Sequence, residues 1–172
     1  QYGTLETLYP NRVELGLGRA PGTDMQTAAA LRRGRNSLDF PAEIAELRGY
    51  FKDCNPISAY PSAGLNIPFY ILGSSTESAY LAAELGLPYA FASHFAPRMM
   101  EMAVEIYRKN FKPSTYLAEP YVILGVNAIV AETDKEARQL ATTQTLFFLN
   151  VVTNAQRNLQ PQMASEEDVW KA

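Results

Sequence analysis

The segment Ile67–Ser78, with the sequence Ile-Pro-Phe-Tyr-Ile-Leu-Gly-Ser-Ser-Thr-Glu-Ser, constrains the fold more than any other part of the chain. Its apolar residues run directly into Gly73, Ser74 and Ser75, and an alanine-rich stretch, residues 78–85, follows. This order predicts a buried strand, then a tight polar turn, then the beginning of a helix.

The predicted turn is a candidate anion site. The first backbone N–H groups of a helix have no partner inside the helix and carry partial positive charge. Phosphate is a common ligand of such helix starts. The alternative is that the hydroxyl of Ser75 or Ser78 only caps its own helix. The local pattern is compatible with both interpretations.

The whole chain alternates predicted strands with predicted helices. The strands are expected near residues 12–18, 67–72, 88–92 and 121–130, and the helices near 41–51, 78–85, 97–111 and from 134 onward. The last strand, Tyr121–Val130, is an almost unbroken apolar run, which is typical of a strand covered on both faces. Strands that alternate with helices imply parallel pairing with right-handed crossovers.

The predicted fold class is therefore α/β, either a (β/α)₈ barrel or a doubly wound open sheet. Four strands are about half of what a barrel needs, so the first option means a partial barrel. No Gly-x-Gly-x-x-Gly motif follows a predicted strand, which disfavours a dinucleotide-binding sheet.

The predicted strand 12–18 has one apolar face, while Glu14, Gly16 and Gly18 occupy the other. A nearly bare face suits the close approach of another backbone or of a flat ligand. The loop Arg19–Asp24 follows.

Composition indicates one globular domain over residues 1–172, because 47% of the residues are hydrophobic and 19% are charged. The net charge of −3 argues against nucleic acid as a partner. No apolar run reaches the roughly 18 residues that cross a bilayer, so no membrane-spanning segment is expected. A single cysteine, Cys54, excludes an internal disulfide and fits a reducing compartment. Since no signal peptide is visible, a cytoplasmic location is expected.

The ends of the chain suggest an internal segment of a longer protein. The sequence begins with Gln1 instead of Met, inside a predicted helix, and stops at Ala172 after a polar stretch. A partial barrel has two open sheet edges. We therefore expect the missing strands to come from another chain, a second copy in a homo-oligomer, or a disordered remainder of the protein. The alternative is that the terminal segments of this chain cover the edges.

Several motifs resemble the bacterial luciferase-like flavin monooxygenases. They are Leu5–Asp24, Leu72–Ser75, Leu81–Phe95 and Tyr107–Pro113, in the same order, and the resemblance covers roughly residues 1–150. It implies a TIM barrel truncated at both ends. It also implies that FMN, supplied in reduced form by a flavin reductase, binds at the C-terminal ends of the strands. O₂ and a small organic substrate would be the other reactants.

The resemblance also implies roles for particular residues. Arg19 matches an arginine that contacts the flavin phosphate, and the turn Gly73, Ser74, Ser75 together with Ser78 matches the other phosphate ligands. By the same comparison, this chain begins in the helix after the third strand and ends before the eighth. A pair of histidines near the end of the second strand of the family's barrel is therefore absent.

His94 is the candidate catalytic residue, because it is the only histidine and follows the predicted strand 88–92. In the family this position lies near the flavin ring or the substrate entrance. The alternative is that His94 only bonds to a neighbouring loop. One histidine and one cysteine cannot supply a metal site.

The sequence is also compatible with other functions. The turn Gly73–Thr76 lacks the Gly-x-Ser-x-Gly elbow of hydrolases, so a serine nucleophile is disfavoured. A non-catalytic flavin-binding or remnant protein would keep the phosphate site without the oxygenation pocket. A deazaflavin-dependent reductase is a further alternative, because relatives of this barrel use that cofactor.

Overall fold

The computed structural model of the chain describes residues 1–20, 25–31, 39–153 and 160–171. The chain forms two compact units, Gln1–Val126 and Asn127–Ala172, which are described separately. Residues 21–24 of the predicted loop after Arg19 lie outside the described residues.

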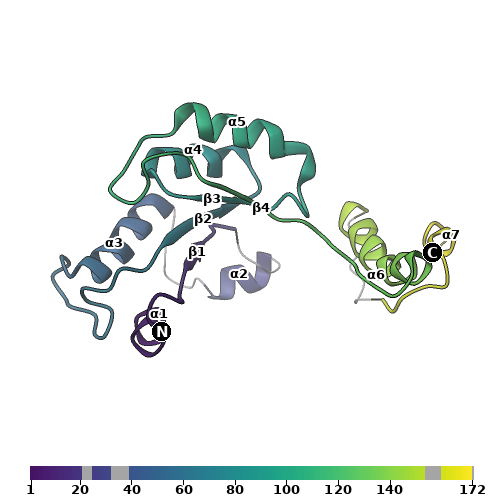
Figure 1. Cartoon of the computed structure of the whole chain (residues 1–172), viewed down its shortest axis with the longest axis horizontal. Helices are drawn as coiled ribbons and strands as arrows, with labels where there is room; N and C mark the ends of the chain where they lie inside the picture. The colour runs from purple at the N-terminus through teal and green to yellow at the C-terminus, as the bar shows by residue number, and fades with distance from the viewer. Residues whose placement is uncertain (21–24, 32–38, 154–159, 172) are drawn as a thin grey trace. The chain divides into compact units, whose positions relative to one another are not determined.

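The first unit contains a sheet of four parallel strands in the order β1-β2-β3-β4 (Figure 1). The strands are β1 Leu15–Leu17, β2 Phe69–Gly73, β3 Tyr89–Phe91 and β4 Val122–Leu124. Each strand pairs with the next one along the chain. A doubly wound sheet reverses its strand order at a switch point, whereas a barrel keeps the order sequential. The sequential order therefore confirms the α/β prediction and favours a partial (β/α)₈ barrel.

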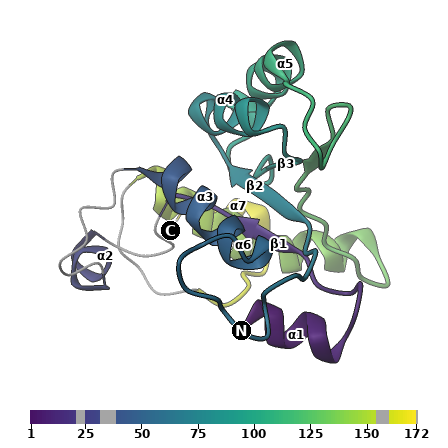
Figure 2. The same ribbon diagram turned by 90° about the vertical axis from the view of Figure 1, so that its left-hand side faces the viewer.

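Helices connect the strands. They are α1 Tyr2–Leu8 before the sheet, α2 Met25–Leu31 and α3 Phe40–Lys52 after β1, α4 Thr76–Leu85 after β2, and α5 Met100–Asn110 after β3. A 3-10 turn, Pro97–Met99, leads into α5. Figures 1 and 2 show α4 and α5 side by side on the same side of β2 and β3.

The core lies between that side of the sheet and the helices. Alternate strand residues and small or aromatic helix residues meet there: Phe69, Ile71, Tyr89 and Phe91 from the strands, Ala79, Ala82 and Ala83 from α4, and Ala103 and Tyr107 from α5. Alanines on the buried side of α4 let this helix lie close to the strands. Its position matters because α4 begins directly after the predicted turn.

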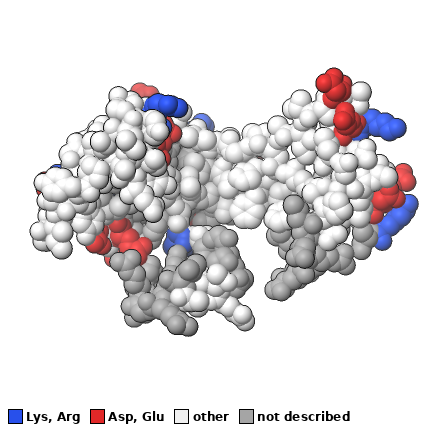
Figure 3. Space-filling model, turned by 90° about the horizontal axis from the view of Figure 1, so that it is seen from below, with Lys and Arg blue, Asp and Glu red and all other residues white. Residues whose placement is uncertain are grey.

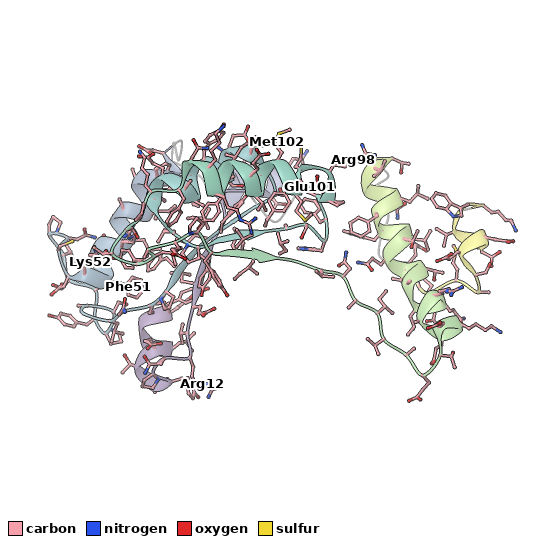
Figure 4. All side chains as sticks on the ribbon, turned by 45° about the horizontal axis from the view of Figure 1, so that its top comes forward. Arg12, Phe51, Lys52, Arg98, Glu101 and Met102 are labelled. Atoms are coloured by element: carbon pink, nitrogen blue, oxygen red, sulfur yellow. The ribbon has the colours of Figure 1, made fainter. Side chains whose placement is uncertain are left out.

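The helix α3 forms as its sequence predicts. Asp39 caps it by accepting a hydrogen bond from the backbone N–H of Ala42 at 3.0 Å, and Pro41 lies in the first turn. Near its end lies Phe51, labelled in Figure 4. Its ring packs edge-on against Phe69, with centroids 5.6 Å apart. The predicted helix 41–51 is confirmed.

The prediction for the strand 121–130 is wrong in length and in burial. Only Val122–Leu124 pair with β3, and the side chains of Val126 and Val130 are 82% and 88% exposed. Among the described strands, β4 has a neighbour on one side only, and the residues after Leu124 pair with none of them. An apolar run predicts a strand that is covered on both faces. The described strands cover β4 from one side only, so the run remains partly exposed.

The bare face predicted for residues 12–18 is filled by a neighbouring strand. A Cβ at Gly16 would lie 2.9 Å from Cδ1 of Leu72, so the glycine makes room for that leucine. Close approach of a neighbouring strand is thus one use of this face, and the alternative of a flat ligand stays a prediction. The strand itself is also shorter than predicted, since β1 covers only Leu15–Leu17.

The second unit contains α6 Asp134–Val152 and α7 Glu166–Val169, and α6 begins where the sequence predicts. Thr142 is fully buried. Its hydroxyl donates to the carbonyl of Gln139 at 2.6 Å and accepts from the backbone N–H of Met163 at 2.8 Å. This links α6 to the segment before α7.

No helix in the described ranges is both long and apolar enough to cross a membrane. On the face drawn in Figure 3, the described surface is mainly uncharged, and its Lys, Arg, Asp and Glu side chains lie in a few small groups, several of which contain both signs. That distribution is in keeping with the small net charge of −3.

Candidate functional site

A cavity of about 280 Å³ lies at the C-terminal ends of β1 and β2. Residues from three places line it: Arg19 and Ala20 after β1, Phe40 and Pro41 at the beginning of α3, and Ile71, Leu72, Gly73, Ser74, Ser75, Glu77, Ser78 and Leu81 from β2 to α4. Leu17 pairs with Ile71, so Arg19 and Gly73 each lie two residues beyond that pair. Strand pairing thus brings Arg19 to the turn after β2.

The five residues predicted to bind the cofactor, Arg19, Gly73, Ser74, Ser75 and Ser78, all line this one cavity. The structure therefore brings them together, although their role in binding stays a prediction. A Cβ at residue 73 would overlap the side chain of Ser78, so only glycine lets the turn approach the helix this closely.

The serine hydroxyls do not cap the helix in the usual way. Ser75 is the N-cap residue of α4 but forms no capping bond to a first-turn N–H. Ser78 donates instead to the backbone carbonyl of Ser75, at 2.7 Å. Its hydroxyl thus stabilises the turn from inside the helix.

Glu77 adds a negative charge to the cavity, which the sequence reasoning missed. Its carboxylate accepts hydrogen bonds from its own backbone N–H and from Ser75 and is attracted by Arg19, and together these lower the pKa of Glu77. A helix start with a nearby arginine favours anions. The missed signal was an acidic residue in the first turn of a helix, a position that acidic residues commonly occupy.

Tyr89, from β3, lies beneath the turn and is fully buried. Its hydroxyl is 2.9 Å from that of Ser78 and 3.1 Å from the carbonyl oxygen of Ser75. Burial raises the pKa of Tyr89. Sequence reasoning could not find this residue, since only the pairing of β2 with β3 places it near the turn.

His94 is exposed and does not line the cavity. It follows β3, and its ring lies against Phe95 and beside Gly125, where a Cβ would overlap the imidazole. Ser93 donates to the carbonyl of Gly125 at 2.7 Å and so fixes this loop to the chain after β4. His94 and the cavity share the C-terminal edge of the sheet, but the structure does not bring them together.

Comparisons with known proteins agree on one family. Residues 1–171 match the model of the luciferase-like monooxygenase family. The chain is 50% identical to the uncharacterized protein YvbT of Bacillus subtilis and 46% identical to a luciferase-like monooxygenase of Escherichia coli, and each match covers 99% of this chain. The crystal structure of apo-MsnO8 superposes with a TM-score of 0.81 at 35% identity and covers 94% of this chain.

The chain spans about half the length of the proteins that it matches. It covers 52% of YvbT and of the E. coli protein, and 50% of the MsnO8 chain. Together with the four sequential parallel strands, this agrees with part of a (β/α)₈ barrel.

Proposed function

The chain belongs to the luciferase-like monooxygenase family, and we propose that its protein uses FMN and O₂ to oxygenate a small organic substrate. The cavity at the ends of β1 and β2 carries this proposal, because it joins Arg19 to the start of α4. The activity of the whole protein is part of the proposal, since the chain covers only about half of its relatives.

The residues of the cavity fit the phosphate of FMN. Arg19 offers a forked, permanently charged donor, and the start of α4 offers backbone N–H groups and a favourable dipole. The backbone N–H of Glu77 and the charge of Arg19 both lower the pKa of Glu77, so this helix start already favours a negative charge. Gly73 keeps the turn close to Ser78.

The protein residues would bind and orient the cofactor, while bound reduced FMN would supply the oxygen chemistry. Arg19 and Ser78 would hold the phosphate. The apolar side chains of Phe40, Leu72 and Leu81 line the same cavity and would exclude water from it. His94, at the same edge of the sheet, is the candidate for holding or moving a proton.

Replacing Arg19 tests the proposed phosphate site. In the intact protein, we expect Arg19→Ala to weaken FMN binding about 10- to 100-fold, because a charge-assisted hydrogen bond is lost. Riboflavin, which lacks the phosphate, should bind as before. Titrations followed by flavin fluorescence measure both affinities.

Arg12→Ala is the matched control. Arg12 lies before β1, at the other end of the strand, and its guanidinium stacks on Tyr9 at 5.9 Å (Figure 4). This variant should bind FMN normally. Unchanged FMN affinity in Arg19→Ala would place the phosphate elsewhere and contradict the proposal.

Oxygen transfer is tested separately with ¹⁸O₂. Incorporation of one labelled atom into a product supports the monooxygenase. FMN binding without oxygen transfer to any tested substrate class would favour the non-catalytic alternative, and preferential binding of a deazaflavin would favour the reductase. A reductase partner, a homo-oligomer and a cytoplasmic location stay predictions.

A further inference from the structure

Three oxygen atoms form a closed triangle beneath the cavity. The hydroxyl of Ser78 lies 2.7 Å from the carbonyl oxygen of Ser75, the hydroxyl of Tyr89 lies 3.1 Å from the same carbonyl, and the two hydroxyls are 2.9 Å apart. Ser78 lines the cavity, whereas Tyr89 is fully buried and does not. One member of the triangle can therefore contact a ligand in the cavity and another cannot.

The triangle has three oxygen–oxygen contacts but only two hydroxyl hydrogens to form them. Each hydroxyl carries one hydrogen, so at most two of the three contacts are well-aligned hydrogen bonds at one time. If Ser78 donates to the carbonyl of Ser75, it has no hydrogen left for a ligand. If Tyr89 donates to that carbonyl instead, the hydrogen of Ser78 is available to the cavity.

We propose that Tyr89 is a positioning residue that lets Ser78 donate a hydrogen bond to a bound phosphate monoester. When the hydroxyl of Ser78 rotates toward the phosphate, the hydroxyl of Tyr89 remains as the side-chain donor to the carbonyl of Ser75, beside the first backbone bond of α4. This inference rests on the proposed function, because it needs the phosphate of the flavin to bind in the cavity.

The surroundings of Tyr89 suit this role. Its ring packs against Tyr107 and Phe91, with centroids 5.4 Å and 6.0 Å away, and its backbone N–H bonds to the carbonyl of Tyr121 at 3.0 Å. These contacts hold the hydroxyl in place while that of Ser78 rotates. Burial raises the pKa of Tyr89, so its hydroxyl keeps its hydrogen at neutral pH.

Tyr89→Phe removes the hydroxyl and keeps the ring. In this variant, a Ser78 hydroxyl that turns to the phosphate leaves the carbonyl of Ser75 with only the first backbone hydrogen bond of α4, which an N-cap carbonyl accepts. One hydrogen bond to a part-buried carbonyl is then lost on binding, so we expect FMN to bind about 3- to 10-fold more weakly. Riboflavin should bind as in the unchanged protein. The measured quantity is the ratio of the two dissociation constants in the intact protein.

A double-mutant cycle with Ser78→Ala tests the coupling. In Ser78→Ala no hydroxyl at residue 78 has to leave the carbonyl of Ser75 when phosphate binds. Tyr89→Phe should therefore change FMN affinity less than about 2-fold in that background. A full effect of Tyr89→Phe in the Ser78→Ala background would overturn the inference.

Tyr107→Phe is the matched control. Tyr107 is equally buried and packs on Tyr89, but its hydroxyl donates to the carbonyl of Leu87 at 2.9 Å and accepts from the N–H of Tyr121 at 3.2 Å. This variant should lose stability in thermal unfolding and keep the ratio of FMN to riboflavin affinity.

The outcomes separate the two proposals. An unchanged protein that binds FMN no better than riboflavin would refute the phosphate site itself. A preference for FMN that survives in Tyr89→Phe would refute only the role of Tyr89. Equal weakening of both ligands by Tyr89→Phe would show a general structural effect and would also refute that role.

Discussion

Single residues set the charge of the cavity, which is lined by one negative side chain, Glu77, and one positive side chain, Arg19. Glu77 stabilises α4, because a carboxylate in the first turn interacts favourably with the helix dipole. The same carboxylate also repels an anionic ligand in the cavity. Its effects on stability and on phosphate binding should therefore have opposite signs.

Glu77→Gln separates these two effects. We expect FMN to bind about 2- to 5-fold more tightly in this variant at neutral pH, because an exposed like charge is removed. The gain should shrink in high salt, which screens exposed charges. Riboflavin affinity serves as the control, and weaker FMN binding would contradict the assignment of Glu77 to an anion site.

The stability effect of Glu77→Gln should depend on pH. The pKa of Glu77 is lowered in the folded protein, so its contribution is present above its ordinary pKa of 4.5 and is lost as pH falls through the lower folded value. Urea unfolding should show the variant slightly less stable at pH 7 and equal to the unchanged protein once both are well below pH 4.5. A difference that persists in strong acid would point to another cause.

At the scale of elements, α4 is defined by its two ends. It begins at the turn that lines the cavity and ends at Gly86, whose left-handed conformation has a φ of 59°. The backbone N–H of Gly86 donates a hydrogen bond to the carbonyl of Ala83, and the N–H of Leu87 donates one to the carbonyl of Ala82. A Cβ at residue 86 would also overlap the backbone carbonyl of Lys112.

Gly86→Ala should therefore destabilise the protein by about 2–4 kcal/mol, since left-handed strain and a clash with backbone add together. Gly64→Ala is the control: Gly64 has a φ of 82°, but nothing lies within 4 Å of its would-be Cβ. It should cost only about 1 kcal/mol. Urea unfolding measures both, and equal losses would show that the contact with residue 112 contributes nothing.

Elements with a clear local signal were predictable from the sequence. The period of the apolar residues indicated α3, and the alanine-rich stretch that ends before Gly86 indicated α4. The same holds for the turn at Gly73. The extent of β4 was not predictable, because its apolar run reflects neighbours that the described strands do not supply. Tyr89 was missed because its role arises from strand pairing.

At the scale of the whole molecule, the described sheet of the first unit has two unpaired edges, at β1 and at β4. Among the described strands, β1 and β4 each have one neighbour. The exposed residues Leu72, Ile123 and Leu124 are 43%, 39% and 43% accessible. A parallel sheet normally has both faces and both edges covered, so these surfaces favour association.

We therefore expect the 172-residue chain, produced by itself, to sediment at micromolar concentration as species heavier than its 19.1 kDa. Leu124→Lys should reduce this association, since charge on an edge strand opposes pairing with another chain. Tyr80→Lys is the control, because Tyr80 is 53% exposed but lies on α4, away from the sheet edge. The edge-strand explanation fails if the unchanged chain sediments as a stable monomer, or if both lysine variants dissociate it equally.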